Sequence, residues 1–261
     1  MLQQIFALQE SFDCSFSKRT TVPHVHHYRD ENISDMYSSN FTQIYDASDE
    51  DWIKSYIAKQ LQDAKERELG HLKVTLHPSL PFSDELMLAA GSLGFETSVI
   101  LYMLAPLDVS ASMPPRPGCT VLRGDTEAVR EAGLRCLVAY DSLTIDPDFA
   151  VRKGNRKREV YQASEIVPYV CYVENEAVGV CDWLQLGQLV RMEEFLILDA
   201  WQRKGLGTEM IRIMMQDAQK RGATHMYLTA YDEQTAKDMY HKLGFTVVAR
   251  ELQLTWVNKS E

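Results

Sequence analysis

Gln202-Arg203-Lys204-Gly205-Leu206-Gly207-Thr208 is the stretch of sequence that decides the fold. It follows an apolar run that ends at Leu198, and it leads into residues 207–220, whose apolar side chains recur at helical spacing. A strand, a glycine-containing turn and a helix N-terminus aim backbone N–H groups and the positive end of the helix dipole at one point. The glycines would let phosphates approach the backbone, and Arg203 and Lys204 add positive charge. The stretch therefore predicts a diphosphate site.

Two better-known phosphate loops do not match this stretch. A dinucleotide-binding fingerprint needs a third glycine where Met210 lies, and the loop of nucleoside-triphosphate hydrolases needs Gly-Lys followed by Ser or Thr. A simple turn before a helix explains the loop alone equally well. The neighbouring sequence has to decide between the two interpretations.

Strands and helices alternate on both sides of the loop. This order predicts an α/β (α+β) fold with a mixed twisted sheet flanked by helices. Asn175-Glu176 is expected to be a tight turn, and residues 141–165 are expected to be irregular. The predicted strands are 119–123, 169–174, 177–183, 190–198 and 225–231, the predicted helices are 126–140, 207–220 and 234–243, and a closing β-hairpin joins 245–250 to 252–257.

The run from Arg191 to Phe245 resembles the GNAT acetyltransferase family. A strand bearing Phe195-Leu196-Ile197 precedes the Gln-x-x-Gly-x-Gly pattern of Gln202–Gly207, and a helix and a strand then lead to Ala236-x-x-x-Tyr240-x-x-Leu243-Gly244-Phe245. The likeness covers the chain from about Cys119 onward. It implies the acyl-CoA N-acyltransferase (GNAT) fold, with acetyl-CoA as co-substrate and no metal.

The resemblance also implies roles for individual residues. The pantetheine arm would lie against Phe195, Leu196 and Ile197, and the diphosphate would be held by the loop from Gln202 to Thr208. Tyr240 would donate a proton to the departing thiolate, a task that suits a phenol, although a packing aromatic explains it too. Family members commonly carry Asn where this chain has Glu233, which puts the role of that Asn in doubt here.

An amine acceptor creates a need for a base. An alkylamine with a pKa near 10.4 is protonated at pH 7, and freeing it costs about 4 to 5 kcal/mol. Glu193 and Glu194 are the candidates, because they lie just before the segment expected to hold the pantetheine. Strict alternation along a strand would send only one of them toward the cleft, and a solvated surface carboxylate is the competing interpretation for either.

The first half of the chain repeats parts of the second. Residues 71–75 (HLKVT) parallel residues 225–229 (HMYLT), and Leu93-Gly94-Phe95 parallels Leu243-Gly244-Phe245. At the place of the glycine loop stand Asp49, Glu50 and Asp51, which suit a helix N-terminus and would repel a diphosphate. We therefore expect two GNAT-like lobes: a degenerate lobe at 1–107, a linker at 108–117 and the acetyltransferase domain at 118–261.

Composition excludes several classes of protein. The 261 residues are 45% hydrophobic and 25% charged, as in ordinary globular chains, and the net charge of −10 disfavours a nucleic-acid binder. No apolar run is long enough to span a membrane and the N-terminus lacks a basic leader, so we expect a cytoplasmic protein with no membrane partner. Five scattered cysteines predict reduced thiols.

Two further features carry weaker signals. The stretch His24-Val25-His26-His27 could place two imidazoles on one strand face, but no partner ligands accompany it, and we expect no metal. The basic run Arg152–Arg158 is expected to be a solvated loop, with the adenosine 3′-phosphate or an acidic substrate as alternative ligands.

The sequence therefore predicts an N-acetyltransferase. The acetyl group of acetyl-CoA would pass to an amine of a small molecule or peptide by direct attack in a ternary complex. The alternative is a catalytically silent acyl-CoA-binding or regulatory module. The acidic net charge favours cationic amines. The sequence leaves open whether the chain forms a homodimer.

Overall fold

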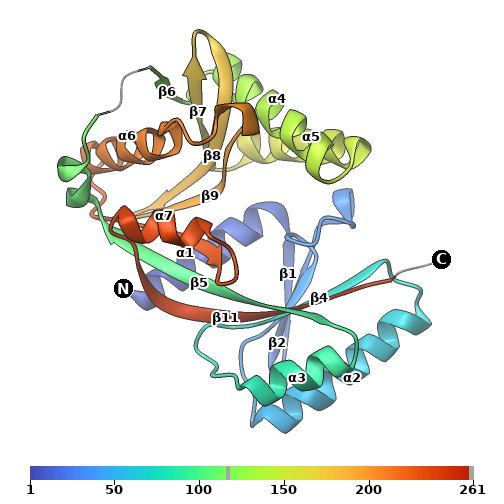
Figure 1. Cartoon of the computed structure of the whole chain (residues 1–261). Helices are drawn as coiled ribbons and strands as arrows, with labels where there is room; N and C mark the ends of the chain where they lie inside the picture. Colours follow the sequence, from blue (N-terminus) through green and yellow to red (C-terminus); the bar gives the residue numbers. More distant parts are fainter. Residues whose placement is uncertain (116–117, 259–261) are drawn as a thin grey trace. The chain divides into compact units, whose positions relative to one another are not determined.

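The computed structural model describes residues 1–115 and 118–258. It shows a mixed α/β fold with an open mixed sheet that is flanked by helices (Figure 1). This confirms the predicted fold class. Arg116 and Pro117 of the predicted linker lie outside the described residues, and Leu107–Ser112 forms a short 3-10 helix. No helix in the described ranges is long and apolar enough to cross a bilayer.

The chain forms two compact units, and each takes segments from both halves of the sequence. Unit 1 comprises Met1–Ser15, Met103–Leu228 and Asp238–Thr246, and unit 2 comprises Phe16–Tyr102, Thr229–Lys237 and the chain from Val247 onward. The strands β5 (Glu96–Pro106) and β10 (His225–Tyr231) run from one unit into the other. The predicted boundary at 108–117 stays a prediction about where one repeat ends and the next begins.

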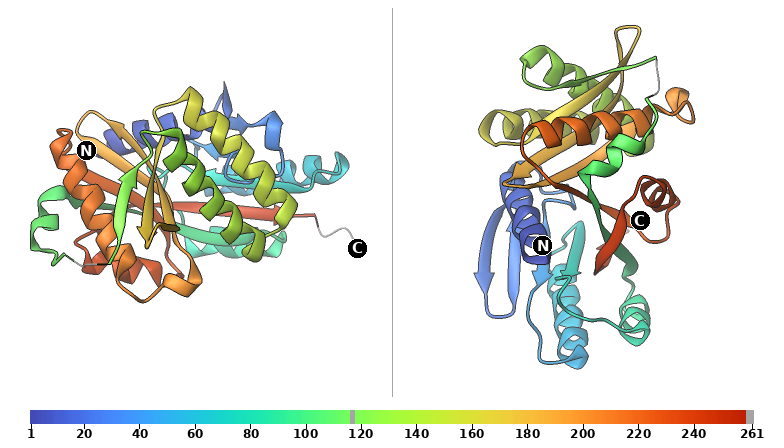
Figure 2. Two further views of the ribbon diagram at one scale, coloured as in Figure 1. Left: turned by 90° about the horizontal axis from the view of Figure 1, so that it is seen from above. Right: turned by 90° about the vertical axis from the view of Figure 1, so that its left-hand side faces the viewer.

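Unit 1 holds the strands and helices that surround the glycine loop. Its strand order is β5-β10-β9-β8-β7-β6, in which β10 is parallel to β9 and the pairs from β9 to β6 are antiparallel. Helix α6 lies on one face of these strands and the pair α4–α5 on the other (Figures 1 and 2). The elements are α1 Leu2–Phe16, β6 Thr120–Arg123, α4 Glu127–Thr144, α5 Pro147–Ala163, β7 Val167–Val173, β8 Glu176–Leu186, β9 Leu189–Ile197, η3 Asp199–Trp201, α6 Leu206–Lys220 and α7 Ala236–Lys242.

Unit 2 is built on the strand order β1-β2-β3-β4-β11-β5. Its core joins apolar side chains of α2 and α3 to those of the strands, including Leu252 and Leu254, which are fully buried. The last strand, β11, pairs antiparallel with β4. The elements are β1 Lys18–Val22, β2 Val25–Arg29, η1 Glu31–Ile33, β3 Phe41–Ile44, α2 Glu50–Glu66, β4 His71–Leu76, α3 Asp84–Ser92 and β11 Thr246–Val257.

Most predicted elements of the second half are confirmed, with three corrections. Residues 141–165 are not irregular, because α5 fills most of them. The predicted closing hairpin is wrong, since β11 is one uninterrupted strand with no turn near Arg250. The tight turn between β7 and β8 lies one residue earlier than expected, at Glu174 and Asn175, whose φ angles of 48° and 73° suit a two-residue hairpin turn.

The predicted repeat is visible in the backbone. The glycines of Leu93-Gly94-Phe95 and Leu243-Gly244-Phe245 have φ angles of 98° and 90°, as glycines that end helices commonly do. After each glycine, the phenylalanine N–H donates back to a helix carbonyl, that of Ala90 at 3.1 Å and that of Tyr240 at 3.0 Å. The two segments therefore share one helix-ending geometry, in which Ala90 occupies the place of Tyr240.

Candidate functional site

The glycine loop of unit 1 leaves the N-terminus of α6 without a side-chain cap. Gly205 is the N-cap residue, its φ is 80°, and no side chain accepts a hydrogen bond from the first helical turn. The Gln202 side chain fixes the loop by donating to the Ile197 carbonyl at 2.9 Å and to Asp199 Oδ1 at 2.8 Å. Lys204 Nζ lies 4.4 Å from the centre of the Trp201 ring. The first-turn N–H groups therefore remain available to an anion.

The loop packs directly on the strand that precedes it. A Cβ atom added at Gly207 would lie 3.2 Å from Phe195 Cζ and 3.8 Å from Ile197 Cγ1. Leu196 points the other way, into a cluster that includes Leu137 of α4. The structure thus brings together the glycine loop and Phe195–Ile197, the two segments that the sequence assigned to the diphosphate and the pantetheine.

A β-bulge lies at the entrance to this strand segment. Val180 is opposite Leu196 and Asp182 is opposite Glu193, so Glu194 and Phe195 together face the single residue Cys181. Glu194 has a φ of 49°, in the left-handed region that glutamate rarely adopts. The bulge interrupts the strict alternation of side chains along β9. The expectation that only one of Glu193 and Glu194 faces the cleft rested on that alternation.

Glu194 is held by two lysines of α5. Lys153 Nζ lies 2.5 Å from Glu194 Oε1, and Lys157 Nζ bonds Glu194 Oε2. Burial alone would raise the pKa of Glu194, but the two ammonium groups outweigh it and lower this pKa to about 2. This carboxylate is therefore ionised at neutral pH, and both of its oxygens are engaged.

The two lysines also bind two other carboxylates. Lys157 Nζ lies 2.5 Å from Asp182 Oδ2, and Lys153 Nζ lies 3.0 Å from Asp141 Oδ2. The Tyr161 hydroxyl donates to Asp182 Oδ1 at 2.5 Å. We call these six residues the α5 network: Asp141, Lys153, Lys157, Tyr161, Asp182 and Glu194.

Sequence reasoning missed the α5 network, because it expected the basic run 152–158 to be a solvated loop. Lys153 and Lys157 instead point into unit 1 and are 9% and 2% exposed. The signal that could have found the helix is Asp146-Pro147, an N-cap residue followed by proline in the first helical turn.

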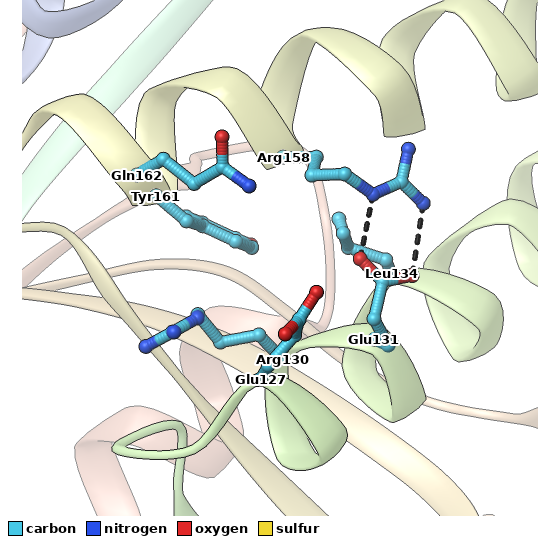
Figure 3. A pocket seen from close by; sticks show the side chains of 7 residues that line it. All are labelled: Glu127, Arg130, Glu131, Leu134, Arg158, Tyr161 and Gln162. Carbon is cyan, nitrogen blue, oxygen red and sulfur yellow. Dashed lines mark hydrogen bonds and ion pairs between the residues drawn. The ribbon is translucent and has the colours of Figure 1, made fainter.

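Residues of α4 and α5 line a cavity of about 130 Å³ (Figure 3). Arg158 makes a two-pronged contact with Glu131 there, at 2.6 Å and 2.9 Å. The remaining lining residues are Glu127, Arg130, Leu134, Tyr161 and Gln162. Helices α4 and α5, which line the cavity, lie on the face of the unit 1 strands opposite α6 (Figure 1).

Tyr240 lies near Cys181 and Glu193, two residues at the bulge. Tyr240 is 7% exposed, and its ring meets that of Phe245 edge to face. Burial raises the pKa of Tyr240, and nearby Cys181 and Glu193 add to the effect, so its phenol keeps its proton at neutral pH. Glu193 Oε2 accepts from Arg191 Nη2 at 2.5 Å.

The histidines of unit 2 do not assemble a metal site. His24 contacts Asp46 at 3.0 Å, His26 stacks on Tyr45, and His27 bonds Thr42 at 2.9 Å. Across the described ranges, no group of three or more His, Cys, Asp or Glu side chains is placed to hold a metal ion.

Comparisons with known proteins agree with this geometry. Residues 137–245 match the model of the acetyltransferase (GNAT) family. The chain is also 27% identical over 237 residues, 88% of each protein, to a Bacillus subtilis (strain 168) protein described as the uncharacterized N-acetyltransferase CgeE. Residues 137–245 are thus similar to the GNAT acetyltransferases, and most of the chain is similar to one N-acetyltransferase of that description.

Solved structures show the same fold. A conserved Staphylococcus epidermidis protein of unknown function matches with a TM-score of 0.76 at 17% identity, over 93% of this chain and 94% of that one. A GCN5-related N-acetyltransferase from Kribbella flavida matches at 0.67 and 14%, over 98% and 95%. A tandem GNAT protein from the clavulanic acid biosynthesis pathway matches at 0.55 and 10%, over 92% and 86%. The GNAT fold and its tandem arrangement, both expected from the sequence, are confirmed.

Proposed function

We propose that this chain is a GNAT enzyme that transfers the acetyl group of acetyl-CoA to an amine of a small molecule or peptide, within a ternary complex. The observation that carries the proposal is the uncapped N-terminus of α6, framed by Gly205 and packed on Phe195. Backbone N–H groups and the positive end of a helix dipole bind a diphosphate well. No carboxylate lies in the loop from Gln202 to Thr208 to repel it.

The residues present fit the co-substrate. The loop Gln202–Thr208 would hold the diphosphate, and the strand segment Phe195–Ile197 would lie along the pantetheine arm. Arg203 and Lys204 would add positive charge at the rim. When bound, acetyl-CoA supplies an acetyl group whose carbonyl carbon is attacked by the amine nitrogen, with cleavage of the carbon–sulfur bond.

Tyr240 is our candidate for the proton donor to the departing sulfur. Its ring is largely buried, and its hydroxyl keeps its proton at neutral pH. A positioned acid of this kind typically contributes a factor of roughly 100 to 10,000 in rate. Burial among apolar groups is also what a packing role would give, so the Tyr240→Phe substitution is needed to separate the two.

Glu193 is the better of the two candidate bases. Glu194 has a lowered pKa and both oxygens bound by lysines, so it takes up a proton poorly at pH 7. Glu193 has one ion pair, with Arg191, and its side chain is 28% exposed. We therefore assign proton removal from the amine to Glu193, directly or through water, and a structural role to Glu194.

The cytoplasm is the proposed location, because the five cysteines are free thiols. The alternative function is a chain that binds acyl-CoA without transferring the acyl group. Incubation with acetyl-CoA and a panel of aminoglycosides, polyamines and peptides separates the two. Amine-dependent release of the CoA thiol is expected. Tight CoA binding without turnover on any amine would favour the silent module.

A further inference from the structure

Glu194 adopts a backbone conformation that its own chemistry opposes. A φ of 49° is left-handed, and in that region the Cβ atom of any L-residue other than glycine is crowded. Asn and Asp tolerate it better than glutamate because their short side chains bond the local backbone. Such a conformation persists only where the surroundings over-determine it. The contacts of the Glu194 side chain must therefore stabilise its left-handed backbone conformation.

The contacts come from α5 and grip both carboxylate oxygens. Lys153 takes Oε1 and Lys157 takes Oε2, so the carboxylate is held at two points. Each lysine is itself anchored by a second carboxylate, Asp141 for Lys153 and Asp182 for Lys157. Charge-assisted bonds of this kind are stronger and shorter than neutral ones. The α5 network can therefore hold Glu194 where its backbone alone would not stay.

The conformation of Glu194 determines which face of the sheet receives Phe195. With the bulge, Phe195 points to the face of α6 and packs on Gly207. Without it, regular alternation from Glu193 onward would shift every later side chain by one position and turn Phe195 to the α4–α5 face. The Gly207 backbone would then lose the ring on which it rests.

We propose that Lys153 and Lys157 are positioning residues for the acyl donor: by gripping the Glu194 carboxylate they maintain the bulge in β9, which places Phe195 under the glycine loop and sets the strand for the pantetheine. The inference rests on the proposed function. It assigns part of the basic run to the donor site, acting from the opposite face of the sheet through Glu194.

The test compares glycine with alanine at position 194. Lys153→Met removes one grip, and CoA affinity measured by titration calorimetry is expected to fall about tenfold, as Glu194 leaves the strained conformation. In that background, Glu194→Gly should restore affinity to within about threefold of the wild type, because glycine adopts a left-handed φ without strain. Glu194→Ala removes the same charge but keeps a Cβ atom, and should not restore it.

The two double variants leave Asp141 equally unpaired, so the loss of its partner cancels between them. Arg158→Met, which removes a charge from the same helix and breaks the ion pair with Glu131, is the matched control and should bind CoA like the wild type. Equal affinities for the glycine and alanine variants, or an unchanged affinity in Lys153→Met, would overturn the proposal.

Two further outcomes are informative. If Lys153→Met does not fold, the single variants Glu194→Gly and Glu194→Ala give the same comparison, with wild-type affinity expected only for glycine and equal affinities overturning the proposal. If the wild-type protein binds no CoA, the proposed function fails and the inference falls with it. Wild-type binding with no glycine–alanine difference rejects the inference alone.

Discussion

The N-termini of α6 and α2 occupy corresponding places in the two repeats and are finished in opposite ways. At α6, Gly205 leaves the first turn without a side-chain acceptor. At α2, Asp49 accepts from the Trp52 N–H at 2.8 Å, and Glu50 accepts from the Ser83 N–H and hydroxyl at 2.8 Å and 2.6 Å. The second repeat leaves its helix end without a side-chain cap, as our proposed anion site requires, whereas the first repeat caps its helix end with Asp49.

The helices that lead into the two Leu-Gly-Phe segments, α3 and α7, also differ at a position with a proposed function. Their ends share one backbone geometry, but the position that carries a phenol at Tyr240 carries a fully buried methyl group at Ala90. Alanine has no proton to donate. In our proposal, a few side chains of this kind separate the repeat that carries the catalytic site from the degenerate repeat.

Separating the repeats is the largest perturbation of this comparison. A chain of residues 118–261 would retain β11 but lose β4 and β5, the strands on either side of it. Leu252 and Leu254, now buried in the core of unit 2, would be exposed. We expect no cooperative unfolding transition in circular dichroism. A soluble, folded fragment that binds CoA like the full chain would show that the second repeat is self-sufficient.

Removing the phenol makes the second repeat resemble the first at one position. Tyr240→Phe should lower kcat by roughly 10- to 1,000-fold with little change in CoA affinity, because only the transferred proton is lost. Steady-state kinetics with thiol detection measure it. Tyr172→Phe, a similar change on β7, serves as control. A kcat near that of the wild type, with chemistry shown to limit the rate, would return Tyr240 to a packing role.

Closing the helix end of the second repeat tests the loop. Gly205→Val should weaken CoA binding about tenfold or more, because a side chain at this left-handed position strains the turn and obstructs the approach of phosphates. Gly187 has a φ of 57° in the turn between β8 and β9, so Gly187→Val introduces comparable strain away from the loop. Similar CoA affinities in the two variants would remove the loop from the site.

Opening the helix end of the first repeat has the smallest expected effect. Asp49→Ala removes the cap of α2 and should cost about 1 kcal/mol in the free energy of unfolding, measured with urea. It should leave CoA affinity and stoichiometry unchanged, because Glu50 and Asp51 still repel a diphosphate there. A second CoA bound by this variant would show that the cap alone had closed the site.

The loop and Tyr240 could be found from the sequence because both belong to a local pattern of fixed spacing. The α5 network could not, because the inward positions of α5, which normally carry apolar side chains, include Lys153 and Lys157. Their partners come from α4, β8 and β9, so only the folded chain shows that these charges are neutralised. The same holds for Glu193 and Glu194, whose orientation depends on a bulge that strict alternation does not predict.

The closing strand shows a different kind of error. The sequence pattern predicts a hairpin over residues 245–257, although no Gly, Pro, Asn or Asp lies between Arg250 and Leu252 to make a turn. The buried Leu252 and Leu254 and the half-buried Trp256 continue one alternating strand. Unit 2 takes up this strand beside β4, a long-range pairing that sequence spacing does not reveal.

The most direct test of the account is the number of CoA molecules that the intact chain binds. Titration calorimetry of the wild-type protein should give one site per chain, and the same site should be weakened by Gly205→Val and be unaffected by Asp49→Ala. That result is expected because, of the two corresponding helix ends, the N-terminus of α6 has no side-chain cap, whereas Asp49 caps α2. Two equivalent CoA sites per chain, or one site that survives Gly205→Val unchanged, would contradict it.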